Sequence, residues 1–332
     1  MKIKNLSLSF FTVILLLFLI EVSLRITGSG PRIIHDFSLN EPITNIPDEN
    51  LGWSPKVGQH IFKPWSEDGK ITRLTINKDK SRVTGSDNLQ KKKIIFIGGS
   101  VTQGWAVDDL ETFSSFIQRR SKKYKISNFG VSAYGGFQSL LLLEKIFNNN
   151  KDIELVIYGY TPHHEVRNVA AGSWMYLLNF FSTRGFVKLP YASIDKENNL
   201  VRNKPIKYIN LPFGNKSALI AKIEKKIMKI KSLKREYKKF EISKKIIKEM
   251  NKISNENNSE FKFLILENLP KKKIDRYKDF LIKNNIALIN CPMPQDKEHV
   301  VKNEGHPSAL GHKITGECIY KQIEILTVNY EN

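Results

Sequence analysis

The sequence predicts an α/β domain in which a parallel β-sheet is covered by helices on both faces. From Lys93 onward, short apolar runs rich in β-branched residues alternate with stretches that have helical spacing. Such alternation is typical of parallel sheets, because each strand is joined to the next by a helical crossover. The chain has 332 residues, of which 41% are hydrophobic, and these suffice for a substantial core.

The predicted elements follow one another in a regular order. Strands are expected at residues 94–98, 125–130, 154–160, 261–268 and 286–291. Helices are expected at residues 111–123, 137–149, 216–252 and 273–285, and a final helix runs to about residue 326. Ligands of parallel sheets bind at the carboxyl ends of the strands. The first three strand ends and the loop after Cys291 should therefore lie along one edge.

The chain divides into three parts by composition. Residues 1–28 form an apolar N-terminal segment, residues 29–90 an irregular prefix rich in Pro, Gly, Asn and Trp, and residues 91–330 the α/β domain. We expect the prefix to pack on the domain. Residues from about 165 to 258 form a helical insertion between the third and fourth strands. We expect it to act as a cap or lid, because the inserted chain leaves the edge where a site would lie.

The N-terminal segment resembles a membrane-spanning helix. Residues 6–20 are uncharged and mostly apolar, and Glu21 and Arg25 follow, four residues apart on one helix face. Crossing a bilayer takes roughly 20 residues, so the helix must include the apolar residues interspersed after this run. Lys2 and Lys4 favour a cytoplasmic N-terminus, and the rest of the chain would then be exported. A cleaved signal peptide is the alternative, although no convincing cleavage site follows the apolar run.

About half of the net charge of +20 lies in residues 216–252, which hold 14 Lys and Arg against 4 Glu. Apolar residues recur there with the spacing of an amphipathic helix. One interpretation is binding to an anionic surface, either lipid head groups or an acidic polymer. The other is a solvated lysine-rich helix, which the sequence alone favours. A nucleic-acid partner is not expected for an exported domain.

The two cysteines are Cys291 and Cys318. An exported location permits a disulfide between them but does not require one. We expect both to be buried apolar residues.

Two segments at the predicted edge carry the residue types of acyl-transfer chemistry. Ser100 follows the first strand in a glycine-rich bend, where the next helix offers backbone N–H groups to a developing oxyanion. His306 lies in NEGHPSALGH before the final helix, and Glu304 could orient its ring. Serine, histidine and carboxylate together supply a nucleophile, a proton acceptor and an orienting charge. The alternatives are a plain turn at Ser100 and a surface histidine at 306.

Two further segments lie at the same edge. The small residues of NFGVSAYGG, residues 128–136, would let a backbone N–H approach a substrate oxygen, although an ordinary strand-to-helix turn is the alternative. YGYTPHHEVRN, residues 158–168, offers His163 and His164 as side-chain donors. Neighbouring histidines point apart and no further His or Cys cluster is near, so we expect no metal.

The order of these four segments resembles that of the SGNH, or GDSL-type, hydrolases. GGSVTQG resembles the nucleophile block, and NFGVSAYGG, YGYTPHHE and NEGHPSALGH resemble the second, third and last, over roughly residues 93–325 without the insertion. LGWSPKVG and LTINKDKSR resemble a segment that often precedes this domain in membrane-anchored bacterial members. The resemblance implies a three-layer, flavodoxin-like fold and ester hydrolysis or acyl transfer without a cofactor or metal.

The resemblance also assigns roles to individual residues. It implies Ser100 as the nucleophile and His306 as its base. The family usually has Asp three residues before this histidine, where this chain has Asn303. Glu304 is therefore the candidate for the acid that orients the ring.

For the oxyanion hole, the resemblance implies the backbone N–H groups of Ser100 and Ala133 and a side chain of the third block. Asn is usual in that block, and His163 and His164 stand there instead. Either imidazole can donate a hydrogen bond, and we favour His164. Gly99 stands where Asp is usual, and Ala133 where Gly is usual. Further support for the site is expected from Gly130, Asn303 and Arg167.

Together these observations predict a membrane-anchored, exported serine esterase or acyltransferase acting on O-acyl groups, foremost O-acetyl esters of a cell-envelope glycan. The substrate class rests on location and family analogy. Two alternatives stay open: a lipase or lysophospholipase at the membrane surface, and a catalytically inactive SGNH-like module that binds partners in envelope assembly. The expected partners are an acylated glycan or lipid and the membrane, without nucleic acid or metal.

Overall fold

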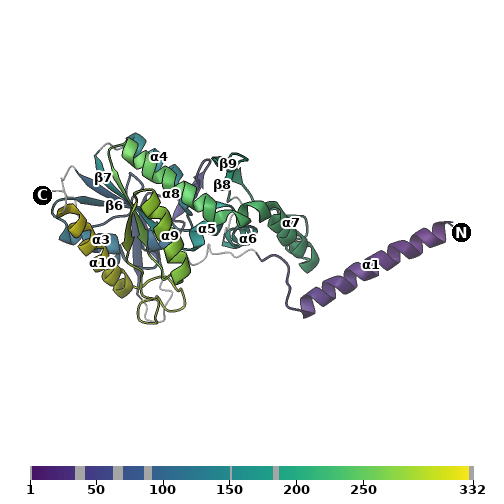
Figure 1. Ribbon diagram of the computed structural model, residues 1–332. Coiled ribbons are helices and arrows are strands. Elements are labelled where there is room, and N and C mark those ends of the chain that lie inside the picture. The colour runs from purple at the N-terminus through teal and green to yellow at the C-terminus, as the bar shows by residue number, and fades with distance from the viewer. Residues whose placement is uncertain are drawn as a thin grey trace.

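The structure, a computed structural model, confirms the α/β class, with a five-stranded parallel sheet between layers of helices (Figure 1). It describes residues 2–33, 42–62, 70–85, 92–149, 152–181 and 187–328. The sheet is formed by β5 (Lys93–Gly98), β6 (Lys125–Gly130), β7 (Ile153–Tyr160), β10 (Glu260–Ile265) and β11 (Ala287–Asn290). Each strand begins within one residue of its predicted start, because strands buried on both faces are continuous apolar runs.

The strand order is that of a flavodoxin-like sheet. In space the strands run β11-β10-β7-β5-β6, and all neighbours are parallel. Numbered along the chain, this is the order 2-1-3-4-5, in which the connections change direction between the first and third strands. The carboxyl end of β5 therefore lies at the crevice where ligands bind in such sheets.

Two layers of helices cover the sheet. One apolar cluster joins the sheet to α4 (Gly136–Asn149), α8 (Lys239–Glu256) and α9 (Lys271–Lys283). The other joins it to α3 (Phe113–Arg120) and α10 (Ala309–Val328). In β5, Ile95 and Ile97 belong to the first cluster and Ile94 and Phe96 to the second, as the two-residue period of a strand requires. The domain thus has the predicted three layers.

The described part of the prefix contains two antiparallel strand pairs, formed by β1 (Asn45–Asp48) with β2 (Gly52–Pro55) and by β3 (Gly58–Phe62) with β4 (Thr72–Ile76). It packs on the domain: the Trp53 indole donates a 3.0 Å hydrogen bond to the Ser132 carbonyl oxygen, and Arg82 forms a β-bridge with Asn128. Between β5 and α3 lie the short helix α2 (Ser100–Gln103) and a 3-10 turn, Asp109–Glu111.

The segment between β7 and β10 differs from the expected helical lid. It contains α5 (His163–Asn168), α6 (Gly172–Phe181), the hairpin of β8 (Leu189–Ile194) and β9 (Leu200–Ile206), α7 (Ala218–Tyr237) and α8. The lysine-rich stretch is two helices, because the chain leaves helical geometry at Lys238. The apolar face of α8 packs in the layer over the sheet. Within the described ranges, then, α8 is a crossover helix and not part of a lid.

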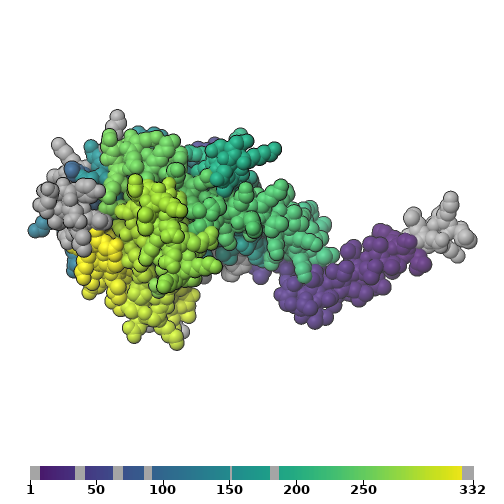
Figure 2. All heavy atoms as spheres, in the orientation of Figure 1, coloured from purple at the N-terminus to yellow at the C-terminus, as the bar shows by residue number. Residues whose placement is uncertain are grey.

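The N-terminal helix α1 (Lys2–Ile26) extends away from the domain (Figures 1 and 2). The 19 residues Leu8–Ile26 have a mean hydropathy of 2.2, and none of this window is buried. At about 1.5 Å per residue the window is close to the thickness of a bilayer core. By length and composition it can cross a membrane, and a signal sequence would pass the same test.

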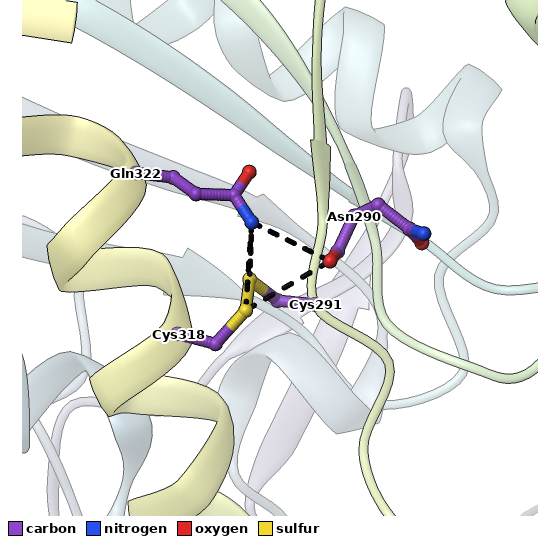
Figure 3. The surroundings of a disulfide bond; sticks show 4 residues. All are labelled: Asn290, Cys291, Cys318 and Gln322. Atoms are coloured by element: carbon purple, nitrogen blue, oxygen red, sulfur yellow. Dashed lines mark hydrogen bonds between the residues drawn. A yellow bond between two sulfur atoms is a disulfide. The ribbon is translucent and has the colours of Figure 1, made fainter. Parts of the chain in front are cut away.

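Cys291 and Cys318 form a disulfide (Figure 3), which the sequence permitted but did not require. Cys291 is buried, as expected, whereas Cys318 is half-buried. Cys291 follows β11 and Cys318 lies in α10, and their Cα atoms are 5.8 Å apart. The bond forms because the end of β11 and α10 lie side by side, which their sequence separation of 27 residues does not reveal. It closes the segment that carries Glu304 and His306.

His312 is a buried, neutral histidine in α10. Its ring stacks on Phe113 with centroids 5.8 Å apart, and its Nδ1 accepts a 3.3 Å hydrogen bond from the Phe113 backbone N–H. Burial lowers the pKa of His312 to about 3, and the positive charge of Arg82 acts in the same direction.

Acidification from pH 7 to pH 5 should therefore destabilise the protein. In this window the unfolded His312 takes up a proton and the folded one does not. The free energy of unfolding therefore decreases as the pH is lowered. His312 should contribute about 2 kcal/mol to this fall, at about 1.4 kcal/mol per pH unit below an unfolded pKa of roughly 6.5. Urea titrations at both pH values should show a loss smaller by this amount in His312→Gln. Equal losses in variant and parent would mean that the folded ring is protonated.

Candidate active site

Ser100 begins a helical turn that lies directly on the edge of the sheet. Three neighbouring strands carry glycines side by side at this edge: Gly98, Gly130 and Gly159. A Cβ atom on any of the three would lie 2.3 Å from an atom of α2, either Thr102 Oγ1 or the Gln103 backbone nitrogen. Only glycine permits so close an approach. The half-buried Ser100 is thereby fixed at the carboxyl end of β5.

Ser100, His306 and Glu304 form a continuous hydrogen-bonded chain. The Ser100 hydroxyl lies 2.8 Å from Nε2 of His306, and Nδ1 lies 2.7 Å from Oε1 of Glu304. The other carboxylate oxygen, Oε2, accepts a 2.8 Å hydrogen bond from the backbone N–H of His306. The ring and the carboxylate therefore hold one mutual orientation. A histidine between a hydroxyl and a carboxylate is placed to act as a general base.

A compact turn presents these two residues. The carbonyl oxygen of His306 accepts a 2.8 Å hydrogen bond from the Val301 backbone N–H, and the Val301 carbonyl accepts one of 2.9 Å from Gly305. Asn303 has a left-handed backbone with φ of 67°, a conformation that Asn tolerates better than most residues. Asn303 thus shapes the turn that presents Glu304 and His306.

Ser100 and His306 line a cavity of about 280 Å³. Its walls come from the segments after β5, β7, β10 and β11, the carboxyl ends of four of the five strands. Outside the Ser100–His306–Glu304 chain, the cavity is lined mainly by polar side chains: Thr161, His163, Arg167, Glu267 and Gln295. The cavity is therefore suited to a polar ligand.

The two neighbouring histidines occupy different environments. His163 lines the cavity. His164 is fully buried, and its Nδ1 lies 2.7 Å from the Tyr158 hydroxyl. Burial lowers the pKa of both rings, and the positive charge of Arg167 acts in the same direction. Both histidines are therefore neutral at pH 7, and His163 is the one that faces the cavity.

Arg167 and Glu267 place opposite charges at the cavity. Arg167 donates a 3.0 Å hydrogen bond to the Tyr134 carbonyl oxygen, and its guanidinium lies 4.4 Å from the ring centroid of Trp174. Burial lowers the pKa of Arg167 to about 10, while Glu267 opposes that shift. Burial raises the pKa of Glu267. Arg167, expected as a supporting residue, is thus part of the cavity wall.

Thr161, Glu267 and Gln295 were not singled out in the sequence. Thr161 and Glu267 follow β7 and β10 within two residues, and Gln295 follows β11. Thr161 could have been found from its position, because a polar residue directly after a buried parallel strand lies at the ligand-binding edge. Glu267 was missed because the strand predicted at residues 261–268 includes it, whereas β10 ends at Ile265.

Ala133 lies in the turn between β6 and α4, in left-handed conformation with φ of 66°. The left-handed region favours glycine, the residue usual there in the family that the sequence resembles. Ala133 is not among the residues that line the cavity. Its neighbour Ser132 donates its backbone N–H to Gln103 Oε1 at 3.1 Å, which ties this turn to α2.

Gly99 and His164 are matched in space. A Cβ atom on Gly99 would lie 2.8 Å from Nε2 of His164 and 3.2 Å from the Tyr134 carbonyl oxygen. The imidazole occupies the space that a side chain at position 99 would need. This accounts for glycine where the resemblance leads one to expect Asp.

In the described parts of the chain, no group of three or more His, Cys, Asp or Glu residues is arranged to hold a metal ion. No family model and no curated protein matches the chain.

By fold, the chain is similar to solved structures of SGNH/GDSL esterases. One is the psychrotrophic esterase EstA from Pseudoalteromonas sp., with 11% identity, 71% of this chain and 98% of that chain covered, and a TM-score of 0.40. Another is the acetyl xylan esterase Est2A from Butyrivibrio proteoclasticus, with 10% identity, coverages of 79% and 68%, and a TM-score of 0.39. A third is a member of the lipolytic G-D-S-L family from Veillonella parvula, with 11% identity, 69% of this chain and 97% of that chain covered, and a TM-score of 0.35.

Gly99→Ala should destabilise the fold by about 1–3 kcal/mol, because the new methyl group overlaps a buried ring that has little room to shift. It should also lower any activity of Ser100, the next residue. In a His164→Ala background the penalty should shrink, because the ring is gone. The free energies of unfolding of the four proteins measure the coupling.

Gly30→Ala is the control, at a glycine where a Cβ would meet nothing within 4 Å. Equal penalties for Gly99→Ala with and without the His164 ring would contradict the spatial match.

Proposed function

We propose that this protein is a serine hydrolase of the SGNH type, an esterase or acyltransferase that acts on O-acyl esters. The observation that carries the proposal is the hydrogen-bonded chain of Ser100, His306 and Glu304 beside a cavity. Such a chain cleaves esters through a covalent acyl intermediate. The four sequence segments and the flavodoxin-like strand order support membership of the SGNH family.

In the proposed reaction, Ser100 Oγ attacks the carbonyl carbon while Nε2 of His306 takes the hydroxyl proton. The bond to the alcohol oxygen then breaks, and His306 returns the proton to that oxygen, which leaves an acyl group on Ser100. Water or a sugar hydroxyl attacks the acyl carbon and gives its proton to His306. The bond between the acyl carbon and Ser100 Oγ then breaks, and His306 returns the proton to Ser100 Oγ. Glu304 orients the ring and stabilises the imidazolium formed in each half.

For the oxyanion, we retain the backbone N–H groups of Ser100 and Ala133 as proposed donors. As the third donor we propose His163 in place of His164, because His163 lines the cavity and His164 is enclosed behind Gly99. A neutral imidazole carries one N–H, which is sufficient for this role.

The cavity supports a polar substrate with a short acyl group, such as an O-acetylated glycan. Polar side chains surround Ser100, and Arg167 and Glu267 are charged. A long acyl chain placed against them would desolvate these charges without offering hydrogen bonds in return. The volume of about 280 Å³ is at the small end for ligand sites. These features favour the glycan esterase over the lipase.

We further propose that α1 anchors the protein in a membrane and that the domain, preceded by the prefix of residues 29–90, is exported. The apolar window Leu8–Ile26 supports the anchor, and the disulfide supports an oxidising compartment. Glu21 in α1 also contacts α7, and a cleaved signal peptide would forfeit this contact.

Ser100→Ala should abolish turnover of p-nitrophenyl acetate, by at least about 10³-fold, because the acyl acceptor is removed. Labelling by a fluorophosphonate should disappear with it, and mass spectrometry should locate the label of the parent on Ser100. Ser193→Ala is the matched control: Ser193 in β8 is also half-buried and lies outside the cavity, so this variant should behave as the parent. A folded parent that neither turns over nor labels would favour the inactive binding module.

Glu304→Gln should lower kcat by about 10²- to 10⁴-fold with little change in KM, because an amide can turn its N–H₂ toward Nδ1 and favour the wrong tautomer of His306. Steady-state kinetics with a small ester measure the effect. Asn303→Gly, which keeps the left-handed turn beside Glu304, should leave kcat within a few-fold of the parent. An unchanged kcat in Glu304→Gln would remove this acid from the proposed mechanism.

A further inference from the structure

Helix α7 presents an apolar stripe to solvent. Its buried face is made of small or polar residues and one methionine: Ala218, Ala221, Glu224, Met228 and Ser232. The larger apolar side chains lie on the other side, where Ile223 is 42% exposed, Ile230 64%, Leu233 59% and Tyr237 91%. These four follow one another at intervals of seven, three and four residues, along one side of the helix. The amphipathic spacing in this part of the sequence therefore marks an outward face.

The charge around this stripe is positive. The exposed residues of α7 include six lysines: Lys222, Lys225, Lys226, Lys229, Lys231 and Lys234. The two acidic residues of α7 turn to the protein. Glu224 pairs with Arg32 at 3.1 Å, and Glu236 accepts a 2.8 Å hydrogen bond from the Gly172 backbone N–H. An outward apolar stripe flanked by lysines is the pattern of helices that lie in a membrane interface.

The apolar helix α1 is joined to the start of α7. The Glu21 carboxylate accepts hydrogen bonds from the backbone N–H groups of Ala218 and Leu219, both at 2.9 Å, and from the Ser217 hydroxyl at 2.8 Å. It thereby caps the first turn of α7, where unpaired N–H groups and the helix dipole favour negative charge. In Figure 1, α7 lies at the end of the domain from which α1 extends. The helix therefore begins where a spanning α1 would leave the bilayer.

We propose that α7 lies on the surface of an anionic bilayer, with its stripe among the head groups and its lysines against lipid phosphates. The inference rests on the proposed anchoring of α1 and is independent of the proposed esterase activity. Three features converge on a lipid surface: the stripe faces outward, the charge around it complements anionic head groups, and Glu21 holds the helix beside the anchor. A soluble partner protein would explain the stripe but not its place beside α1.

The test uses the full chain in nanodiscs, with the fluorophore NBD attached to Ile230→Cys. The disulfide leaves no other free thiol to label. In nanodiscs with phosphatidylglycerol, the emission should shift to shorter wavelength, and a spin-labelled lipid should quench it. The shift should be smaller in pure phosphatidylcholine. Ile282→Cys is the matched control, because Ile282 is a 74% exposed isoleucine on α9; its emission should be the same in both lipids.

Leu233→Cys gives a second position on the stripe, and circular dichroism with thermal unfolding verifies the fold of each variant without reference to activity. If both stripe positions match Ile282 in phosphatidylglycerol, the proposal is overturned. Equal shifts in the two lipids would overturn the requirement for anionic head groups. A shift in detergent that grows with protein concentration would identify a second copy of the chain on the stripe, and it would also overturn the proposal.

Discussion

The close approach of α2 to three glycines is the contact on which the candidate site depends. Parallel strands end at a common edge, and at the ends of β5, β6 and β7 that edge offers backbone without side chains. The turn of α2 can therefore pack directly on the strand ends, and its residues Thr102 and Gln103 are buried in this contact. Ser100 is thus set where the strand order reverses, and the loop between β11 and α10 brings His306 to it.

A buried arginine extends this support into the prefix. Arg82 is 1% exposed, and its guanidinium donates to the backbone carbonyl oxygens that surround it, those of Arg73, Gln103, Gly104 and Val107. Burial lowers the pKa of Arg82, and the nearby Asp109 opposes that shift. Removing the guanidinium would leave several buried carbonyls without a donor, which costs more than the hydrogen bonds themselves contribute. The prefix is therefore part of the scaffold that holds α2.

The sheet was predictable because each strand is a local run of buried apolar residues. The meeting of Ser100, His306 and Glu304 was also foreseeable, since each lies beside a predicted element, although their catalytic roles stay predictions. The disulfide and the burial of His164 could not be predicted from the sequence, because both depend on which distant segments of the chain come into contact. In α7 the apolar spacing shows that one side is apolar but not whether it faces core or solvent. Glu267 was missed because the predicted strand at residues 261–268 includes it, whereas β10 ends at Ile265 and leaves Glu267 at the ligand-binding edge.

Contacts between α7 and the end of α5 connect the proposed membrane surface to the candidate site. Arg235 of α7 donates to the carbonyl oxygens of Val169 at 2.9 Å and Ala170 at 3.3 Å, directly after the helix that carries His163 and Arg167. These hydrogen bonds join α7 to the backbone that follows α5. Because α5 carries residues of the cavity wall, the position of the cavity relative to α7 is fixed. In the proposed arrangement, Ser100 can reach only acyl groups presented at that height above the bilayer. The range of substrates would then be limited both by the height of Ser100 above the bilayer and by the charged residues that line the cavity.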